Sequence, residues 1–176
     1  MSSLTKQIFI IASLMIVGLI TVSLPITAEA KKSMGSKIGP SLWPDAAASK
    51  IVSLARTGKS EASILVQTQR VAVKETGPKV TVAKFGEVYD WSPAFFAVHQ
   101  NEPTQIKFWN LQPDDYHTFE LMSPEGKVLM NLVLPPLSHK SYVFTFHEQG
   151  LYKFICPIHQ PDMNGQILVL PSARRG

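Results

Sequence analysis

Apolar and polar residues alternate along most of this chain with a period of two, the spacing that is typical of β-strands. Turn-forming clusters rich in Pro, Gly, Asn and Asp separate the alternating runs. Many short strands with no helices between them favour an antiparallel β-sandwich or barrel. The strand-like runs cover residues 64–66, 71–73, 80–82, 95–98, 105–109, 117–121, 127–133, 141–146, 151–156 and 166–170.

One segment ahead of the later runs predicts a short helix that lies outside the core. Pro44 and Asp45 are favourable at a helix N-terminus, Arg56 is favourable in a last turn, and Gly58 ends the segment. The apolar positions between these ends are Ala46, Ala47, Ile51, Leu54 and Ala55. The residues before Pro44 are polar and aperiodic, so we expect a flexible lead-in there.

The first thirty residues have the pattern of an export signal. Lys6 gives a positive start, residues 8–24 form an apolar run of 17 residues, and Pro25 breaks it. Ala28-Glu29-Ala30 then matches the small-x-small pattern at which signal peptides are cleaved, so we expect cleavage after Ala30. The alternative is an uncleaved anchor, because 17 residues approach the length that spans a bilayer. Both interpretations predict a periplasmic or otherwise exported protein.

The charge is unevenly distributed along the chain, whose formal net charge is +4. Residues 31–84 hold 10 Lys and Arg against 3 Asp and Glu, whereas residues 85–176 hold 6 against 9. The basic half is suited to contact with anionic lipid headgroups or an acidic partner, although a solvated surface has the same pattern. Basic and aromatic residues do not interleave in a dense cluster, so a nucleic-acid partner is not expected.

The chain has one cysteine, which excludes an intrachain disulfide, a CxxC redox pair and any four-cysteine metal site. Cys156 ends the predicted aromatic strand 151–156 and shares the inward face of Phe154. His159 and Met163 follow on a loop that two prolines prevent from continuing as a strand. A thiolate, an imidazole and a thioether form a soft ligand set that suits copper better than zinc. A blue copper site also needs a second histidine, and His117, where a turn enters a strand, is the natural candidate.

The region around these residues resembles the cupredoxins, the family of plastocyanin, pseudoazurin and amicyanin. The matching motifs occur in the family's order: Trp91-Ser92-Pro93, Phe108-Trp109-Asn110, Asp115-Tyr116-His117-Thr118, Gly150-Leu151-Tyr152-Lys153-Phe154-Ile155-Cys156, and Cys156-x-x-His159 with Met163 and Asn164-Gly165. The resemblance implies a Greek-key β-sandwich. The expected parts are a signal peptide (1–30), a lead-in with the short helix (31–60), an extension strand (61–79), the cupredoxin domain (80–171) and a tail (172–176).

The resemblance also implies one type 1 copper ion. His117, Cys156 and His159 would be its strong ligands and Met163 its axial ligand. Three residues separate His159 from Met163, whereas plastocyanin-like loops usually have four and amicyanin-like loops two. The length of the axial bond, and with it the spectrum and the reduction potential, therefore stays open.

A one-electron carrier is the function that this resemblance implies. Electrons would pass through the exposed edge of His159, and transient docking would bring a redox partner such as a c-type cytochrome or an oxidoreductase to this edge. We expect an apolar docking patch from Leu111, Pro113, Pro135, Pro136, Leu137 and Ile158. Thr118 and Asn164 flank ligands and are candidates for hydrogen bonds that orient the site.

Two other classes of function use some of the same residues. Copper delivery or storage would need the same four ligands but fast metal exchange. An enzyme is not expected, because copper oxidases and nitrite reductases need further histidine-rich centres, and two of the five histidines are already assigned. Of the remaining residues of these types, His99, His139 and His147 are expected to face solvent, and Met122 and Met130 to pack in the interior.

Overall fold

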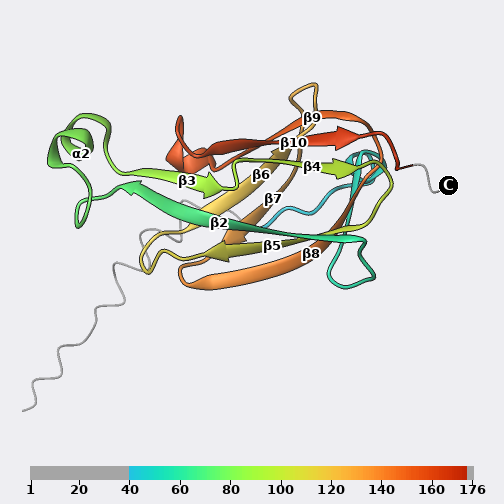
Figure 1. Ribbon diagram of the computed structural model, residues 1–176, viewed down its shortest axis with the longest axis horizontal. Helices are drawn as coiled ribbons and strands as arrows, with labels where there is room; N and C mark the ends of the chain where they lie inside the picture. The colour runs from blue at the N-terminus through green and yellow to red at the C-terminus, as the bar shows by residue number, and fades with distance from the viewer. Residues whose placement is uncertain (1–39, 174–176) are drawn as a thin grey trace, which may run out of the picture.

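The computed structural model describes residues 40–173, which form two five-stranded β-sheets that lie face to face (Figure 1). The signal peptide expected over 1–30 and most of the lead-in lie outside the described residues, as does the end of the tail. Among the residues described, no helix is both long and apolar enough to span a membrane.

The first sheet has the order β1-β8-β5-β2-β3 and the second the order β4-β10-β9-β6-β7. The strands of the first sheet are β1 (Val52–Ala55), β2 (Ala62–Ala72), β3 (Val88–Ser92), β5 (Thr104–Asn110) and β8 (Ser138–Phe146). Those of the second are β4 (Phe95–His99), β6 (His117–Met122), β7 (Val128–Leu134), β9 (Gly150–Ile155) and β10 (Asn164–Leu170).

Both sheets are mixed, which corrects the expectation of purely antiparallel pairing. The β2–β5 and β4–β10 pairs are parallel, and all the other named pairs are antiparallel. The reason is the connection between the sheets, since β4 belongs to the second sheet while β3 and β5 belong to the first. The chain therefore returns to the first sheet beside β2 and in the same direction as β2. The extension strand expected over 61–79 is β2, which pairs on both of its edges.

An aromatic cluster between the sheets forms the centre of the core. Phe108 and Phe144 of the first sheet meet Phe119 and Phe154 of the second, and all four rings are fully buried. Burying a phenylalanine side chain contributes about 1.5–3 kcal/mol, so this cluster fixes how the two sheets face one another. Trp91 packs edge-on against two of these rings and leads from the centre of the core towards His117.

The expected helix before the strands is present only as a turn of 3₁₀ helix, η1 (Ala48–Lys50). The Asp45 carboxylate accepts hydrogen bonds from the backbone N–H groups of Ala47 and Ala48, but the 3₁₀ turn begins only at Ala48, three residues after Asp45. The rest of the segment is strand β1, in which Val52 pairs with Phe146 and is fully buried. So short a helix is marginal on its own, and pairing with β8 buries more apolar surface. Its prediction as a helix outside the core was wrong.

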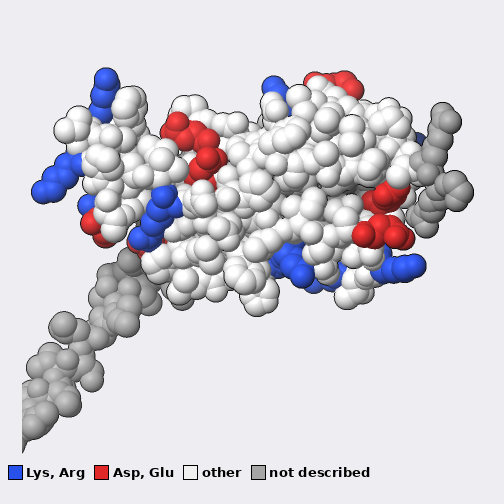
Figure 2. Space-filling view, viewed as in Figure 1, with Lys and Arg blue, Asp and Glu red and all other residues white. Residues whose placement is uncertain are grey.

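The alternating residues 80–82 are also not a strand but part of helix α2 (Lys79–Phe85). This helix lies between β2 and β3 and projects from one end of the sandwich (Figure 1). Pro78 precedes it, and Gly86 follows it at a φ of 81°, a conformation that glycine adopts without strain. The helix buries none of its residues, and basic side chains extend from this lobe in Figure 2.

Candidate metal centre

The two neighbouring strands β6 and β9 bring His117 and Cys156 to the same end of the second sheet. His117 is the first residue of β6, and Cys156 directly follows β9. The strands are antiparallel, with Glu120 opposite Ile155, so the start of β6 lies beside the end of β9. This pairing also places the backbone N–H of Thr118 3.3 Å from the Cys156 Sγ, to which it donates a hydrogen bond.

The loop from β9 to β10 carries the other two candidate ligands. A short 3₁₀ helix, η2 (Pro157–His159), starts at the cysteine and turns His159 back towards it. The backbone N–H of Met163 donates to the carbonyl of His159, and that of Cys156 donates to the carbonyl of Met163. These two bonds close the loop and hold Met163 fully buried.

Four ligand atoms converge in the space between these residues. The Cys156 Sγ lies 3.4 Å from the Nδ1 of His159 and 4.0 Å from the Nδ1 of His117. The Met163 Sδ lies 3.1 Å from the same Nδ1 of His117. The ligand atoms of the cysteine and the two histidines all lie within 4.8 Å of one another. The four residues predicted from the sequence are thus brought together.

These separations fit a metal ion bound between the atoms. Metal bonds of about 2.0–2.1 Å to nitrogen and 2.3 Å to sulfur, at angles between tetrahedral and trigonal, put the two atoms about 3.5–3.8 Å apart. The two observed distances from sulfur to nitrogen bracket this range. A thiolate, two imidazoles and a thioether are the ligand set of a copper site with a weak axial methionine. The residues therefore fit one copper ion.

Burial keeps both histidines in the neutral form that binds a metal. It lowers the pKa of His117 to about 3, and the nearby His159 adds to this effect. Burial also lowers the pKa of His159, partly opposed by the carboxylates of Asp115 and Glu87. The pKa of Cys156 is raised because its burial outweighs hydrogen bonds from neighbouring backbone amides. The metal-free protein therefore holds a thiol, and metal binding releases its proton.

The sequence did not indicate Tyr89, which packs against both histidines. Its ring centroid lies 4.6 Å from that of His159 and 5.1 Å from that of His117. Its hydroxyl donates a hydrogen bond to the carboxylate of Asp115, two residues before His117. The alternation of β3 places Tyr89 and Trp91 on the same buried face, and this pattern could have indicated that Tyr89 points towards the site.

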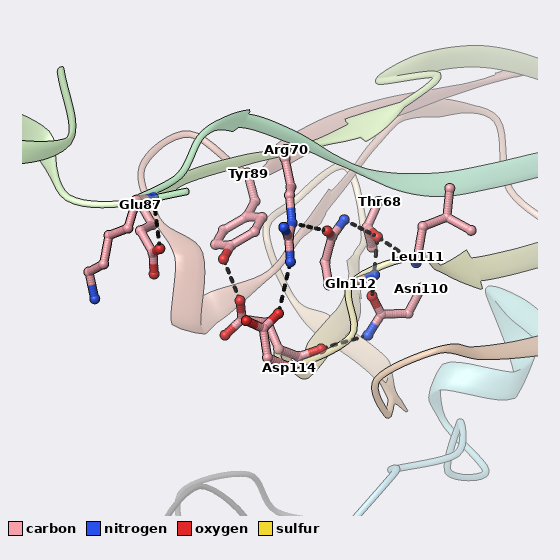
Figure 3. A network of polar contacts seen from close by, with 10 residues as sticks. Thr68, Arg70, Glu87, Tyr89, Asn110, Leu111, Gln112 and Asp114 are labelled. Carbon is pink, nitrogen blue, oxygen red and sulfur yellow. Dashed lines mark hydrogen bonds and ion pairs between the residues drawn. The ribbon is translucent and has the colours of Figure 1, made fainter. Parts of the chain in front are cut away.

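A buried polar network holds the loop that leads into His117 (Figure 3). Asn110 is 1% exposed, and its amide donates to the carbonyls of Asp115, Leu134 and Pro135 at 2.7–3.0 Å. Its side-chain oxygen accepts hydrogen bonds from the backbone N–H of Gln112 and from the hydroxyl of Thr68. The network thereby connects the end of β5 to the loop before β6 and to the end of β7.

Arg70 and Gln160 also support the loops of the site. Arg70 donates to the side chains of Gln112 and Asp114, and the latter is the one ion pair found among the described residues. Gln160 donates from its amide to the carbonyls of Cys156 and Met163, so it bridges the two ends of the ligand loop. Arg70 lies in β2 and Gln160 in the ligand loop, and the sequence alone did not distinguish either residue from a solvated polar one.

Thr118 and Asn164, the two residues expected to orient the site through hydrogen bonds, make different kinds of contact. Thr118 donates to the cysteine sulfur through its backbone, as given above, and not through its hydroxyl. The Asn164 side chain donates to the carbonyls of Pro161 and Asp162 and is exposed. Thr118 therefore touches a ligand atom directly, whereas Asn164 stabilises the loop.

The remaining histidines and methionines partly match their expected environments. His139 is exposed as predicted, and Met130 packs in the core with 1% exposure. His147 is half-buried instead, because its ring bonds to the Ser53 hydroxyl and the Asn101 side chain. His99 is also half-buried and contacts the carbonyl of Pro171.

Apolar side chains are exposed beside the loops of the site. Leu111, Leu137 and Ile158 are 47%, 71% and 42% exposed, and His159 is half-buried. Pro113 is also exposed, whereas Pro135 and Pro136 are half-buried. Trp109, 43% exposed, joins Leu111 and Leu137 around a small pocket and was not expected there.

Comparison with solved structures supports the fold. A copper nitrite reductase from Nitrosomonas europaea aligns with 65% of this chain and 51% of its own, at 10% identity and a TM-score of 0.50. Auracyanin A, a blue copper protein from Chloroflexus aurantiacus, aligns with 61% of this chain and 98% of its own, at 15% identity and a TM-score of 0.44. Amicyanin from Paracoccus versutus aligns with 68% of this chain and 97% of its own, at 13% identity and a TM-score of 0.42.

Sequence comparison adds no family, since no family model and no curated protein matches this chain. The structural neighbours given above are at most 15% identical to it, so the likeness concerns the fold alone. This chain spans about half of the nitrite reductase. The fold is a cupredoxin-like β-sandwich, as the sequence resemblance predicted. Its site joins His117, Cys156 and His159 in a ligand set that fits one copper ion.

Proposed function

We propose that this protein is a mononuclear type 1 copper protein that carries single electrons in the exported compartment. The observation that carries the proposal is the convergence of two imidazole nitrogens, one cysteine sulfur and one methionine sulfur in a buried space. Bound copper would supply a one-electron couple between Cu(I) and Cu(II).

The protein's own part in this function is to hold the ligands still. His117, Cys156 and Met163 are fully buried, and the closed loop with its Gln160 bridge fixes three of the four ligands. Rigid ligands limit the rearrangement that accompanies each change of oxidation state. The N–H of Thr118 stabilises negative charge on the cysteine sulfur, which tunes the potential of the site.

His159 is our candidate for the point of electron exchange. It is the one residue of the four that is not fully buried, and exposed Leu111, Leu137 and Ile158 lie on neighbouring loops. We propose that a redox protein, such as a c-type cytochrome or an oxidoreductase, docks there transiently, since such encounters need only a small interface. Figure 2 shows acidic and basic side chains on the same end of the molecule, beside the lobe that carries α2.

Copper delivery or storage is the alternative function for these ligands. It requires rapid metal exchange, whereas three fully buried ligand residues favour retention. Within the described part of the chain, a single cluster of three or more His, Cys, Asp and Glu residues has metal-binding geometry. This cluster is the mononuclear site on which the carrier proposal rests.

The test is to load the purified protein with Cu(II) and record visible absorption and electron paramagnetic resonance spectra. An intense thiolate-to-copper band is expected, and Cys156→Ser should abolish it. The control His99→Asn changes a histidine away from the site and should keep the band. Loss of copper to a chelator within seconds would instead favour delivery, and the absence of the band from the wild-type protein would refute the proposal.

A further inference from the structure

An open pocket of about 470 Å³ lies at an edge of the sandwich, outside the metal centre. Its lining comprises Ser41, Trp43, Arg56, Lys140, Ser141 and Tyr142. The volume falls in the range of small-molecule sites. None of the candidate copper ligands, and none of the residues that support them, contributes to this lining.

The wall on one side of the pocket is the segment before η1. Leu42 pairs with Asn131 of β7 through two backbone hydrogen bonds of 3.0 Å, and the Ser41 hydroxyl accepts from the backbone N–H of Val133. The segment is therefore anchored to the second sheet. The wall on the other side is β8 of the first sheet, so the pocket lies between the edges of the two sheets.

Lys140 occupies a position that faces the interior of the sandwich. The residues at the same phase of β8, Tyr142, Phe144 and Phe146, are all buried in the core. An inward-facing ammonium is costly without a partner of opposite charge. Burial, together with the nearby charge of Arg56, lowers the pKa of Lys140. The two cations therefore repel one another across a partly desolvated space.

The Ser41 hydroxyl bonds to Val133, but the other polar side chains of this pocket have no hydrogen-bond or ion-pair partner among residues 40–173. No ion pair and no side-chain hydrogen bond there involves Arg56, Lys140, Ser141 or the hydroxyl of Tyr142. Arg56 makes only a cation–π contact, 5.1 Å from the centre of the Trp43 ring, and that ring packs edge-on against Tyr142. Donors and positive charges thus converge without an acceptor, and the pocket lining contains no carboxylate.

We propose that this pocket binds a phosphate group, either free or as part of a small organic molecule. The Arg56 guanidinium, the Lys140 ammonium and the Tyr142 hydroxyl supply donors to the same space, which suits a tetrahedral oxyanion better than a planar carboxylate. The pocket is larger than inorganic phosphate alone, so room remains for an organic portion beside Trp43. The binding does not depend on copper.

An alternative explanation of Lys140 is protection of the sheet edge. Inward-facing lysines on exposed strand edges prevent edge-to-edge aggregation, and β1 covers β8 only from Val143 to Phe146. This explanation concerns Lys140 alone. It does not account for Arg56, which has no ion pair among the described residues, nor for Tyr142 at the same pocket.

The test is calorimetric titration of the full chain with inorganic phosphate in a phosphate-free buffer, with acetate in a parallel titration. Saturable binding of phosphate that is at least ten times tighter than that of acetate is expected. Lys140→Gln and Arg56→Gln should each weaken phosphate binding by about tenfold or more, since each removes a charged donor. The matched control Lys153→Gln removes a lysine from β9 and should leave the affinity unchanged.

Further experiments identify the source of the phosphate group and test the alternative role of Lys140 in protecting the sheet edge. Glycerol 3-phosphate and vesicles containing phosphatidic acid distinguish a soluble ligand from a lipid headgroup, and the Lys140→Gln variant should lose whichever interaction occurs. Thermal unfolding without phosphate shows that each variant is folded. Equal affinity for acetate and phosphate would overturn the proposal. So would a Lys140→Gln variant that aggregates but binds phosphate like the wild type.

Discussion

Replacing Asn110 by alanine should destabilise the fold and loosen the metal centre together. The amide of Asn110 bridges three backbone carbonyls around the loops of the site, and its oxygen accepts two further hydrogen bonds. Since the amide has two protons, the substitution removes about four full hydrogen bonds. At a net 0.5–1.5 kcal/mol each, the expected loss is about 2–6 kcal/mol in the free energy of unfolding.

Urea denaturation of the metal-free protein, followed by circular dichroism, measures this loss directly. In thermal unfolding, at about 2–4 °C for each kcal/mol, the melting temperature should fall by roughly 4–24 °C. The control is Gln105→Ala on the same strand, whose side chain bonds only to the Ser63 hydroxyl at the surface. That variant should change stability by no more than about 0.5 kcal/mol.

A second readout concerns the copper site itself. Because the Asn110 amide holds the backbone that leads into His117, Asn110→Ala should also speed the loss of copper to a chelator. Gln105→Ala should lose copper at the wild-type rate. If Asn110→Ala unfolds at the same urea concentration as the wild type, the network does not hold these loops and the reasoning is wrong.

Three further predictions concern β9, β10 and the loop between them. Burial raises the pKa of Tyr152 to about 12. The neutral phenol therefore contributes its full stabilisation below pH 10, and about 3 kcal/mol of the free energy of unfolding is lost as the pH rises through 12. Tyr152→Phe should remove this part of the alkaline loss, which denaturation curves at several pH values measure. Gly165→Ala should cost more than about 2 kcal/mol in urea denaturation, because its Cβ would lie 2.2 Å from the Phe154 ring, and unchanged stability would contradict this packing. Gln160→Ala removes both hydrogen bonds across the ligand loop and should raise the rate of copper loss, which stopped-flow chelation measures. The free energy of unfolding of the metal-free protein should fall by no more than about 2 kcal/mol.

The candidate ligands could be predicted from the sequence because their positions follow from strand ends. Cys156 ends an alternating aromatic strand and His117 begins another, and this local order is retained in β9 and β6. Met163 was predicted from the soft ligand set and the cupredoxin resemblance, although its spacing from His159 differs from the family's usual ones, and its sulfur lies beside His117. Short-range pattern was sufficient because the loop between Cys156 and Met163 closes on itself.

Other features depended on contacts between segments far apart in the chain. Val52 became part of a strand because it pairs with Phe146, a partner that the local sequence does not indicate. Residues 79–85 form a helix that starts after Pro78, in the connection between β2 and β3. This connection lies away from the sheet, so its alternating residues have no neighbouring strand with which to pair. Tyr89 acquires its contacts with the histidines only when the two sheets face one another.

The parallel pairing of β10 with β4 has a consequence for the order in which the protein matures. β10 is the last strand of the chain, and its partner lies about seventy residues earlier. Such distant pairs form late and slowly, since the intervening chain must first be brought together. Three of the four candidate ligands lie between Cys156 and the start of β10, so they reach their places only when this strand is added. A chain without β10 would contain all four candidate ligands but not their closed arrangement, so a metal ion bound there would enter the finished molecule.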